Sequence, residues 1–201
     1  MKPLLALTLA LAALALPCFA ADLGPEVAVI EIRFGKEKET RRVVLGLYDS
    51  SAPLTVANFK QLAEKKFFNG MRFHRVFPNS FVQTGDPASR RGQADRSGTG
   101  GPGYTLASEI RLPVDKGAVA MARLPDDINP AKNSNGSQFF VALEPLPKLN
   151  GKYTVFGRVL EGFEVLSDIS NLPTNSNDFP LPKVVIKSIL IDSREASAPG
   201  R

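Results

Sequence analysis

Tryptophan is absent from this chain of 201 residues, and cysteine and histidine occur once each, as Cys18 and His74. A single cysteine excludes a disulfide within the chain and dithiol redox chemistry. One histidine and one cysteine also fall short of the ligands that a zinc site needs, and the carboxylates lack the spacing of a calcium-binding loop. The sequence therefore predicts no metal and no other cofactor.

Concentrated positive charge is also missing. The formal net charge is +5, and the basic residues are spread along the chain apart from one cluster, Arg90, Arg91 and Arg96. Proteins that bind nucleic acid usually gather positive charge and aromatic side chains on one face, whereas this chain has three tyrosines and no tryptophan. We interpret the cluster as a solvated loop and expect no nucleic-acid partner.

The first twenty residues differ from the rest in composition. Lys2 is their only charge, and it precedes an apolar run, Leu4–Leu16. The run is shorter than the ~20 residues that a membrane-spanning helix needs, and a small residue, Ala20, follows it after a short gap. This pattern predicts a cleaved signal peptide over residues 1–20 rather than stable insertion into a membrane.

The remaining chain predicts one domain. A hydrophobic content of 43% with 22% charged residues is typical of a packed core, and no linker or internal repeat divides the sequence. We expect the domain to span residues 21–192 and residues 193–201 to form a flexible tail. The tail lacks a retention tetrapeptide, so we expect a periplasmic location, with secretion into the medium as the alternative.

The spacing of apolar residues predicts short strands and two helices. Partial alternation over 27–34 and an apolar run over 43–48 predict a β-hairpin, and helical spacing over 53–65 predicts a helix capped by Thr55 or Ser51. A second short helix is predicted at 163–169. Further strands are predicted at 73–77, 81–84, 118–122, 138–143, 153–159 and 184–191.

Many short strands with frequent turns favour a barrel or a sandwich. Two connections, 87–104 and 124–133, are long for a compact domain. Loops of such length are typical of functional or mobile segments.

Two segments carry the chemistry that the sequence suggests. Residues 73–86 read FHRVFPNSFVQTGD, and residues 135–140 read NGSQFF. Together they combine one arginine and two glutamines with phenylalanines, a set suited to holding a proline ring. They resemble the signature segments of the cyclophilin-type peptidyl-prolyl cis-trans isomerases. The similarity extends over residues 27–191 and includes a GTGG segment at 98–101.

The resemblance implies both a fold and an activity. The fold is mainly β: an eight-stranded antiparallel closed β-barrel capped by two α-helices. The activity is rotation about X-Pro bonds, which crosses a barrier of ~18–20 kcal/mol because amide resonance is interrupted. The expected role is a folding catalyst for exported proteins. The alternative is a non-catalytic module that binds proline-containing segments, or a chaperone, on the same scaffold.

By the same resemblance Arg75 is the catalytic arginine, and Gln83 acts beside it. A guanidinium is a permanent donor, and it suits a proline nitrogen that regains its lone pair as the amide twists. The resemblance assigns substrate contacts to Phe81, Met121, Ala122, Gln138, Phe140, Leu149 and Tyr153. It places His74, Gly98, Thr99, Gly100, Gly101 and Arg123 at the margins of the site.

Three positions depart from the family pattern. Ser80 stands where an aromatic residue is common, Arg123 where asparagine follows Met-Ala, and Lys148 where many eukaryotic members have tryptophan. We expect Arg123 to alter contacts with the substrate backbone, because a guanidinium only donates hydrogen bonds. Lys148 implies weak cyclosporin binding. The expected partners are proline-containing polypeptides, and the protein is expected to be a monomer.

Overall fold

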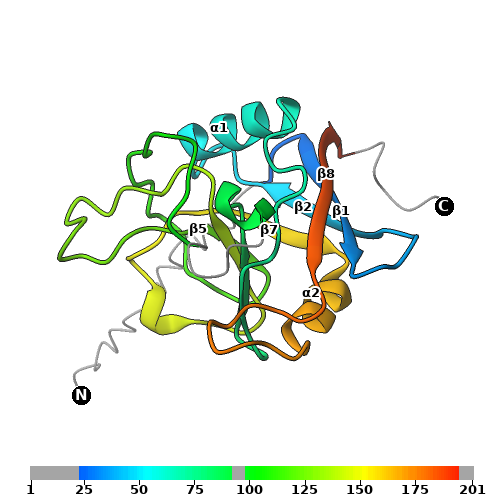
Figure 1. Ribbon diagram of the computed structural model, residues 1–201. Helices are drawn as coiled ribbons and strands as arrows, with labels where there is room; N and C mark the ends of the chain where they lie inside the picture. Colours follow the sequence, from blue (N-terminus) through cyan, green and yellow to red (C-terminus); the bar gives the residue numbers. More distant parts are fainter. Residues whose placement is uncertain (1–22, 92–97, 195–201) are drawn as a thin grey trace, which may run out of the picture.

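Eight antiparallel strands form one strongly curled sheet (Figure 1). The computed structural model describes residues 23–91 and 98–194; the predicted signal peptide, Arg96 and most of the predicted tail lie outside this part of the chain. The strands are β1 (Glu26–Phe34), β2 (Arg41–Leu47), β3 (Arg75–Phe77), β4 (Phe81–Thr84), β5 (Ala118–Met121), β6 (Phe139–Ala142), β7 (Val155–Glu161) and β8 (Val184–Ser193). They pair in the order β3-β4-β6-β5-β7-β2-β1-β8.

Two α-helices, α1 (Pro53–Glu64) and α2 (Phe163–Ser170), lie on opposite sides of the curled sheet (Figure 1). Two short 3-10 helices, η1 (Pro87–Arg91) and η2 (Pro147–Leu149), each begin with proline. Every strand and helix predicted from the sequence is present, with ends that differ by at most two residues. Within residues 23–91 and 98–194, no helix has the length and apolar character needed to cross a membrane.

The last strand is longer than predicted. β8 runs to Ser193, and the N–H of Arg194 donates to the carbonyl oxygen of Pro25 at 2.8 Å. The beginning of the predicted tail is therefore held against the chain just before β1.

The sheet is an open, strongly curled half-barrel, which corrects the expectation of a closed barrel. β3 and β8 are its two edges, and they do not pair with each other. The carbonyl of Asp178, in the loop before β8, instead accepts the N–H of Val76 in β3 at 3.0 Å. On the side away from β1, β8 exchanges hydrogen bonds with residues 70–73, which precede β3. An edge strand whose donors are taken by a loop cannot complete the ladder.

The main core lies between the inner face of the sheet and the two helices. α1 contributes Val56, Phe59 and Leu62, whose spacing places them on one helical face. Phe59 packs against Phe139 of β6 and Phe156 of β7, with ring centroids 5.6 and 5.2 Å away. These contacts of widely separated residues fix the helix on the sheet, because large aromatic rings supply much of the buried apolar area.

The cap of α1 comes from another part of the chain, and the prediction of Thr55 or Ser51 as the cap is wrong. Ala52 is the N-terminal cap residue and offers no side-chain hydrogen bond. The carboxylate of Glu109 accepts the N–H of Leu54 at 3.0 Å, and the N–H and hydroxyl of Thr55 at 2.9 and 2.8 Å. A buried carboxylate at this position satisfies donors at the positive end of the helix dipole.

We predict that Glu109→Ala lowers the free energy of unfolding by about 1–2 kcal/mol, the usual effect of losing a helix cap. Urea denaturation of both proteins measures the change. Glu144→Ala removes an exposed glutamate and is the matched control, with an expected change within about 0.5 kcal/mol. Equal losses in the two variants would contradict the capping role of Glu109.

Candidate active site

A row of side chains crosses the outer face of the sheet. Arg75 of β3 lies directly opposite Gln83 of β4, and Gln83 lies opposite Phe140 of β6. Phe140 in turn lies opposite Ala120 of β5. Residues that face each other in an antiparallel ladder project from the same face. The ladder therefore brings the arginine, one glutamine and one phenylalanine of the two sequence segments side by side.

The side chains of the two adjacent phenylalanines of β6 project from opposite faces of the sheet. Phe139 packs in the main core, whereas Phe140 belongs to a smaller outer cluster that includes Phe81, Leu149 and Tyr153. The Phe140 ring centroid lies 5.5 Å from that of Phe81 and 5.5 Å from that of Tyr153. These side chains form an apolar wall beside Gln83 and Arg75.

This wall belongs to a cavity of about 1020 Å³. The predicted residues that line it are His74, Arg75, Phe81, Gln83, Gly98, Thr99, Ala122, Arg123, Gln138, Phe140, Leu149 and Tyr153. Their presence in one cavity was expected from the sequence; the chemical role of each stays a prediction.

Three predicted residues do not line the cavity. Met121 is only 2% exposed and packs in the main core, because it lies opposite Phe139 rather than Phe140 in the β5–β6 ladder. Gly100 and Gly101 are the other two. The carbonyl oxygen of Gly100 accepts the side-chain amide of Gln138 at 2.8 Å.

The two glutamines are linked to each other. Gln83 Nε2 donates to Gln138 Oε1 at 3.0 Å, and Gln138 Nε2 donates onward to Gly100. The Asn135 side chain joins the same group, because its Nδ2 donates to Gly100 at 3.1 Å and its Oδ1 accepts the N–H of Gln138 at 3.0 Å. A chain of amide hydrogen bonds fixes the orientation of each member. Asn135 begins the NGSQFF segment but was not among the predicted site residues.

Arg75 is an exposed, charged residue of the cavity lining. Its side chain is exposed, and its guanidinium carbon lies 4.9 Å from the ring centroid of Phe77 and 5.7 Å from that of Phe81. No ion pair to Arg75 is formed within the described residues. The aromatic faces orient the guanidinium without neutralising it, which leaves its donors for another acceptor.

The surroundings of Ser80 and Lys148, two of the departures from the family pattern, are as follows. Ser80 belongs to a tight connection in which its N–H donates to Phe77 and its carbonyl accepts from Leu143. Beside it the Phe77 and Phe81 rings lie 4.9 Å apart, so two aromatic rings occupy this side of the site. Lys148 is exposed in η2.

Arg123 lines the cavity but its guanidinium is engaged by protein atoms. It donates to the carbonyl oxygens of Lys152 and Leu124 and pairs with Asp126, and its carbon lies 5.0 Å from the Tyr153 ring centroid. The expected contact of Arg123 with a substrate backbone would have to replace these bonds.

The cavity also contains residues that the sequence analysis did not single out. Leu124, Ile128, Asn129 and Asn133 come from the long 124–133 loop, whose length was its only signal. Ser176, Asn177 and Asp178 come from the loop before β8, which the Val76 hydrogen bond draws to the site. Thr105 and Asn135 complete the lining.

His74 is buried in the cavity wall, and only 3% of its surface is exposed. Burial lowers the pKa of its imidazole, and the Arg75 charge acts in the same direction. Asp86, the backbone of Arg72 and Gln138 oppose this shift only in part, and neither ring nitrogen makes a well-formed hydrogen bond. The ring is therefore neutral at neutral pH. The described residues contain no group of three or more acidic, histidine or cysteine side chains that could hold a metal ion.

Comparison with known proteins links this geometry to one family. The family model described as "Cyclophilin type peptidyl-prolyl cis-trans isomerase/CLD" matches residues 30–191. Peptidyl-prolyl cis-trans isomerase-like 1 of Aspergillus oryzae is 39% identical over 153 residues, which cover 74% of this chain and 89% of the relative. Peptidyl-prolyl cis-trans isomerase B of Bacillus subtilis is 40% identical over 137 residues, covering 67% and 87%.

Solved structures agree. The crystal structure of a Cryptosporidium parvum cyclophilin type peptidyl-prolyl cis-trans isomerase superposes with a TM-score of 0.71 at 30% identity, covering 84% of this chain and 98% of that one. The same C. parvum protein in the presence of the dipeptide Ala-Pro gives a TM-score of 0.70 at 30% identity, covering 83% and 99%.

We predict that lowering the pH destabilises the native protein more than a His74→Gln variant. The folded state holds the pKa of His74 below its ordinary value of 6.5. Below that value the unfolded chain therefore binds a proton that the folded chain resists, and stability is lost as the pH falls toward the folded pKa. Denaturation curves from about pH 8 to about pH 5 measure the slope. Parallel slopes for the two proteins would exclude this contribution of His74.

Proposed function

This chain belongs to the cyclophilin-type peptidyl-prolyl cis-trans isomerase family and is such an isomerase, and we propose that it accelerates X-Pro rotation in exported proteins as they fold. Uncatalysed prolyl isomerisation takes tens to hundreds of seconds and can limit folding. Reducing about 100 s to about 1 ms requires roughly 7 kcal/mol of preferential stabilisation of the twisted amide. No covalent bond is made or broken, so neither a nucleophile nor a metal is needed.

Arg75 is the group that we propose to stabilise the twisted amide. As the imide loses planarity, its nitrogen becomes pyramidal and regains a lone pair. A permanently charged donor interacts more strongly with that nitrogen than with the planar form. The exposed guanidinium beside the Phe81 ring, which forms no ion pair within the described residues, is the observation that supports this role.

The apolar wall is proposed to hold the proline ring while the preceding carbonyl turns. Phe81, Phe140, Leu149 and Tyr153 offer apolar surface next to the charged group. Gln83 and Gln138 are held by their own hydrogen bonds, so they present fixed polar atoms to the substrate backbone. Gripping one part of the substrate while the other rotates converts binding energy into orientation.

We also propose a cellular location for the protein. The composition of residues 1–20 supports export, with the periplasm as the destination and secretion as the alternative. We further propose that the protein acts as a monomer on proline-containing polypeptides. Lys148, at the position where many eukaryotic family members have tryptophan, supports weak cyclosporin binding.

We predict that Arg75→Ala lowers kcat/KM for an X-Pro peptide by roughly a hundred-fold, the scale observed when one preorganised donor to a developing charge is removed. A protease-coupled or fluorescence assay measures the rate. Arg42→Ala, on β2 and outside the cavity, is the matched control and should keep the native rate. Equal rates for the native protein and Arg75→Ala would overturn the role of Arg75, whereas a native rate no faster than the uncatalysed one would favour the non-catalytic binding module.

Export predicts a mature protein that begins at Ala21. Expression of the full chain in a Gram-negative host, followed by fractionation and mass measurement of the purified protein, tests both the compartment and the cleavage site. Recovery of uncleaved protein from the cytoplasm would refute export while leaving the isomerase activity unaffected.

A further inference from the structure

The loop at residues 124–133 presents two apolar side chains to the active-site cavity. Leu124 is 56% exposed and Ile128 is 66% exposed, and both line the cavity that contains Arg75 and Phe140. Neither belongs to the hydrophobic core clusters of the described residues. Exposed apolar side chains within a binding cavity gain free energy when a ligand covers them.

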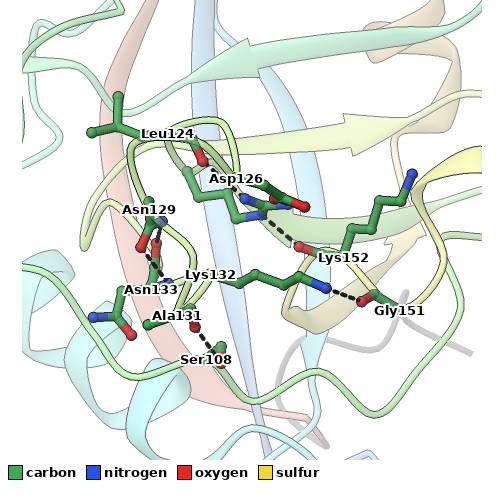
Figure 2. A network of polar contacts seen from close by, with 10 residues as sticks. Ser108, Leu124, Asp126, Asn129, Ala131, Lys132, Asn133, Gly151 and Lys152 are labelled. Carbon is green, nitrogen blue, oxygen red and sulfur yellow. Dashed lines mark hydrogen bonds and ion pairs between the residues drawn. The ribbon is translucent and has the colours of Figure 1, made fainter.

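Arg123 anchors the beginning of this loop, and its side chain is only 5% exposed. Its Nε donates to the carbonyl oxygen of Lys152 at 2.6 Å, and its NH1 donates to the carbonyl oxygen of Leu124 at 2.9 Å. Its NH2 lies 2.5 Å from Oδ1 of Asp126. Figure 2 shows Leu124, Asp126 and Lys152 close together, and the bonds of Arg123 join these three residues. Because the guanidinium is planar and rigid, its donors hold several partners in one geometry.

The rest of the loop is also tied down. The side chain of Asn129 spans the turn: its Nδ2 donates to the carbonyl oxygen of Asn133 at 2.8 Å, and its Oδ1 accepts the N–H of Asn133 at 3.1 Å. Ser108 donates to the carbonyl of Ala131 at 3.2 Å, and Lys132 reaches the carbonyl of Gly151 at 3.4 Å (Figure 2). The loop is therefore a folded part of the cavity wall.

We propose that Arg123 is a positioning residue that holds the 124–133 loop against the cavity, where Leu124 and Ile128 contact an apolar substrate side chain outside the X-Pro pair. This inference rests on the proposed isomerase function and adds a substrate preference to it.

Three observations favour a substrate side chain outside the X-Pro pair as the occupant. The surface is continuous with the proposed proline site, because one cavity of about 1020 Å³ contains both. That volume is at the upper end of the range for small-molecule sites and exceeds what a proline ring fills. The proline wall, Phe81, Phe140, Leu149 and Tyr153, also forms a separate cluster to which the two loop residues do not belong.

The bonding of Arg123 supports a positioning role rather than contact with the reacting amide. The hydrogen bond from Arg123 lowers the pKa of the Asp126 carboxyl, so the pair stays charged through the neutral range. A guanidinium held by two carbonyls and a carboxylate has few donors left for a substrate.

The experiment compares two peptides with the same X-Pro core, one flanked by leucine on both sides and one flanked by serine. We expect native protein to prefer the leucine peptide. Ile128→Ser should raise KM for the leucine peptide about five-fold through lost apolar burial, without a change in kcat. KM for the serine peptide should not change. Leu190→Ser removes a similarly exposed apolar side chain on β8, outside the cavity, and should act as the native protein does.

The second arm tests Arg123. Arg123→Gln and the milder Asp126→Asn should both reduce the preference for the leucine peptide while sparing kcat on the serine peptide. Thermal denaturation establishes that each variant is folded. If Arg123→Gln does not fold, Asp126→Asn still tests the anchor, because it leaves the arginine in place and removes only its carboxylate partner.

Each other outcome has a distinct meaning. Native activity without preference between the peptides would overturn this inference alone. An equal loss of kcat on both peptides in Arg123→Gln would place Arg123 at the reacting amide and overturn its positioning role. Native protein inactive on both peptides would overturn the proposed function and this inference together.

Discussion

The alternation of side chains along paired strands is the constraint on which the site depends. Because Arg75, Gln83, Phe140 and Ala120 occupy one cross-strand row, their neighbours along each strand must face inward. The inward row is the core, in which Phe139 meets Phe59 and Phe156. A shift of one residue in the register of β4 or β6 would bury the polar site and expose the core. The packing energy of the core therefore also specifies the geometry of the site.

Loops complete the site, and buried carboxylates hold them. Glu109 joins the segment before β5 to the start of α1. Asp86 is fully buried and accepts backbone N–H groups from Ala88 and Gly98, so it joins two distant positions of the 87–104 connection beside the cavity. Gly85, with a φ of 87°, adopts a left-handed conformation and lies against the backbone of Ser137 and Gln138. A side chain at this position would meet that backbone.

Arg123 lies at the site, but its guanidinium binds the protein rather than being left free for a substrate. The resemblance places it at a margin where a substrate contact is expected. Its guanidinium is instead engaged by the chain itself, through Lys152, Leu124 and Asp126. These bonds connect the 124–133 loop to the segment that carries Tyr153, whose ring lies beside the guanidinium. Substrate preference would then depend on a loop whose only sequence signal was its length.

The sequence alone determined the elements, the family and most of the cavity lining, because local periodicity and two short motifs carry that information. It did not show that Met121 faces the core, since the face of a strand residue is decided by its partner, here Phe139 of another strand. It also missed Glu109 as a helix cap and predicted a closed barrel. Only the tertiary structure decided these points, because hydrogen bonds such as Val76 to Asp178 join residues whose proximity no local pattern encodes.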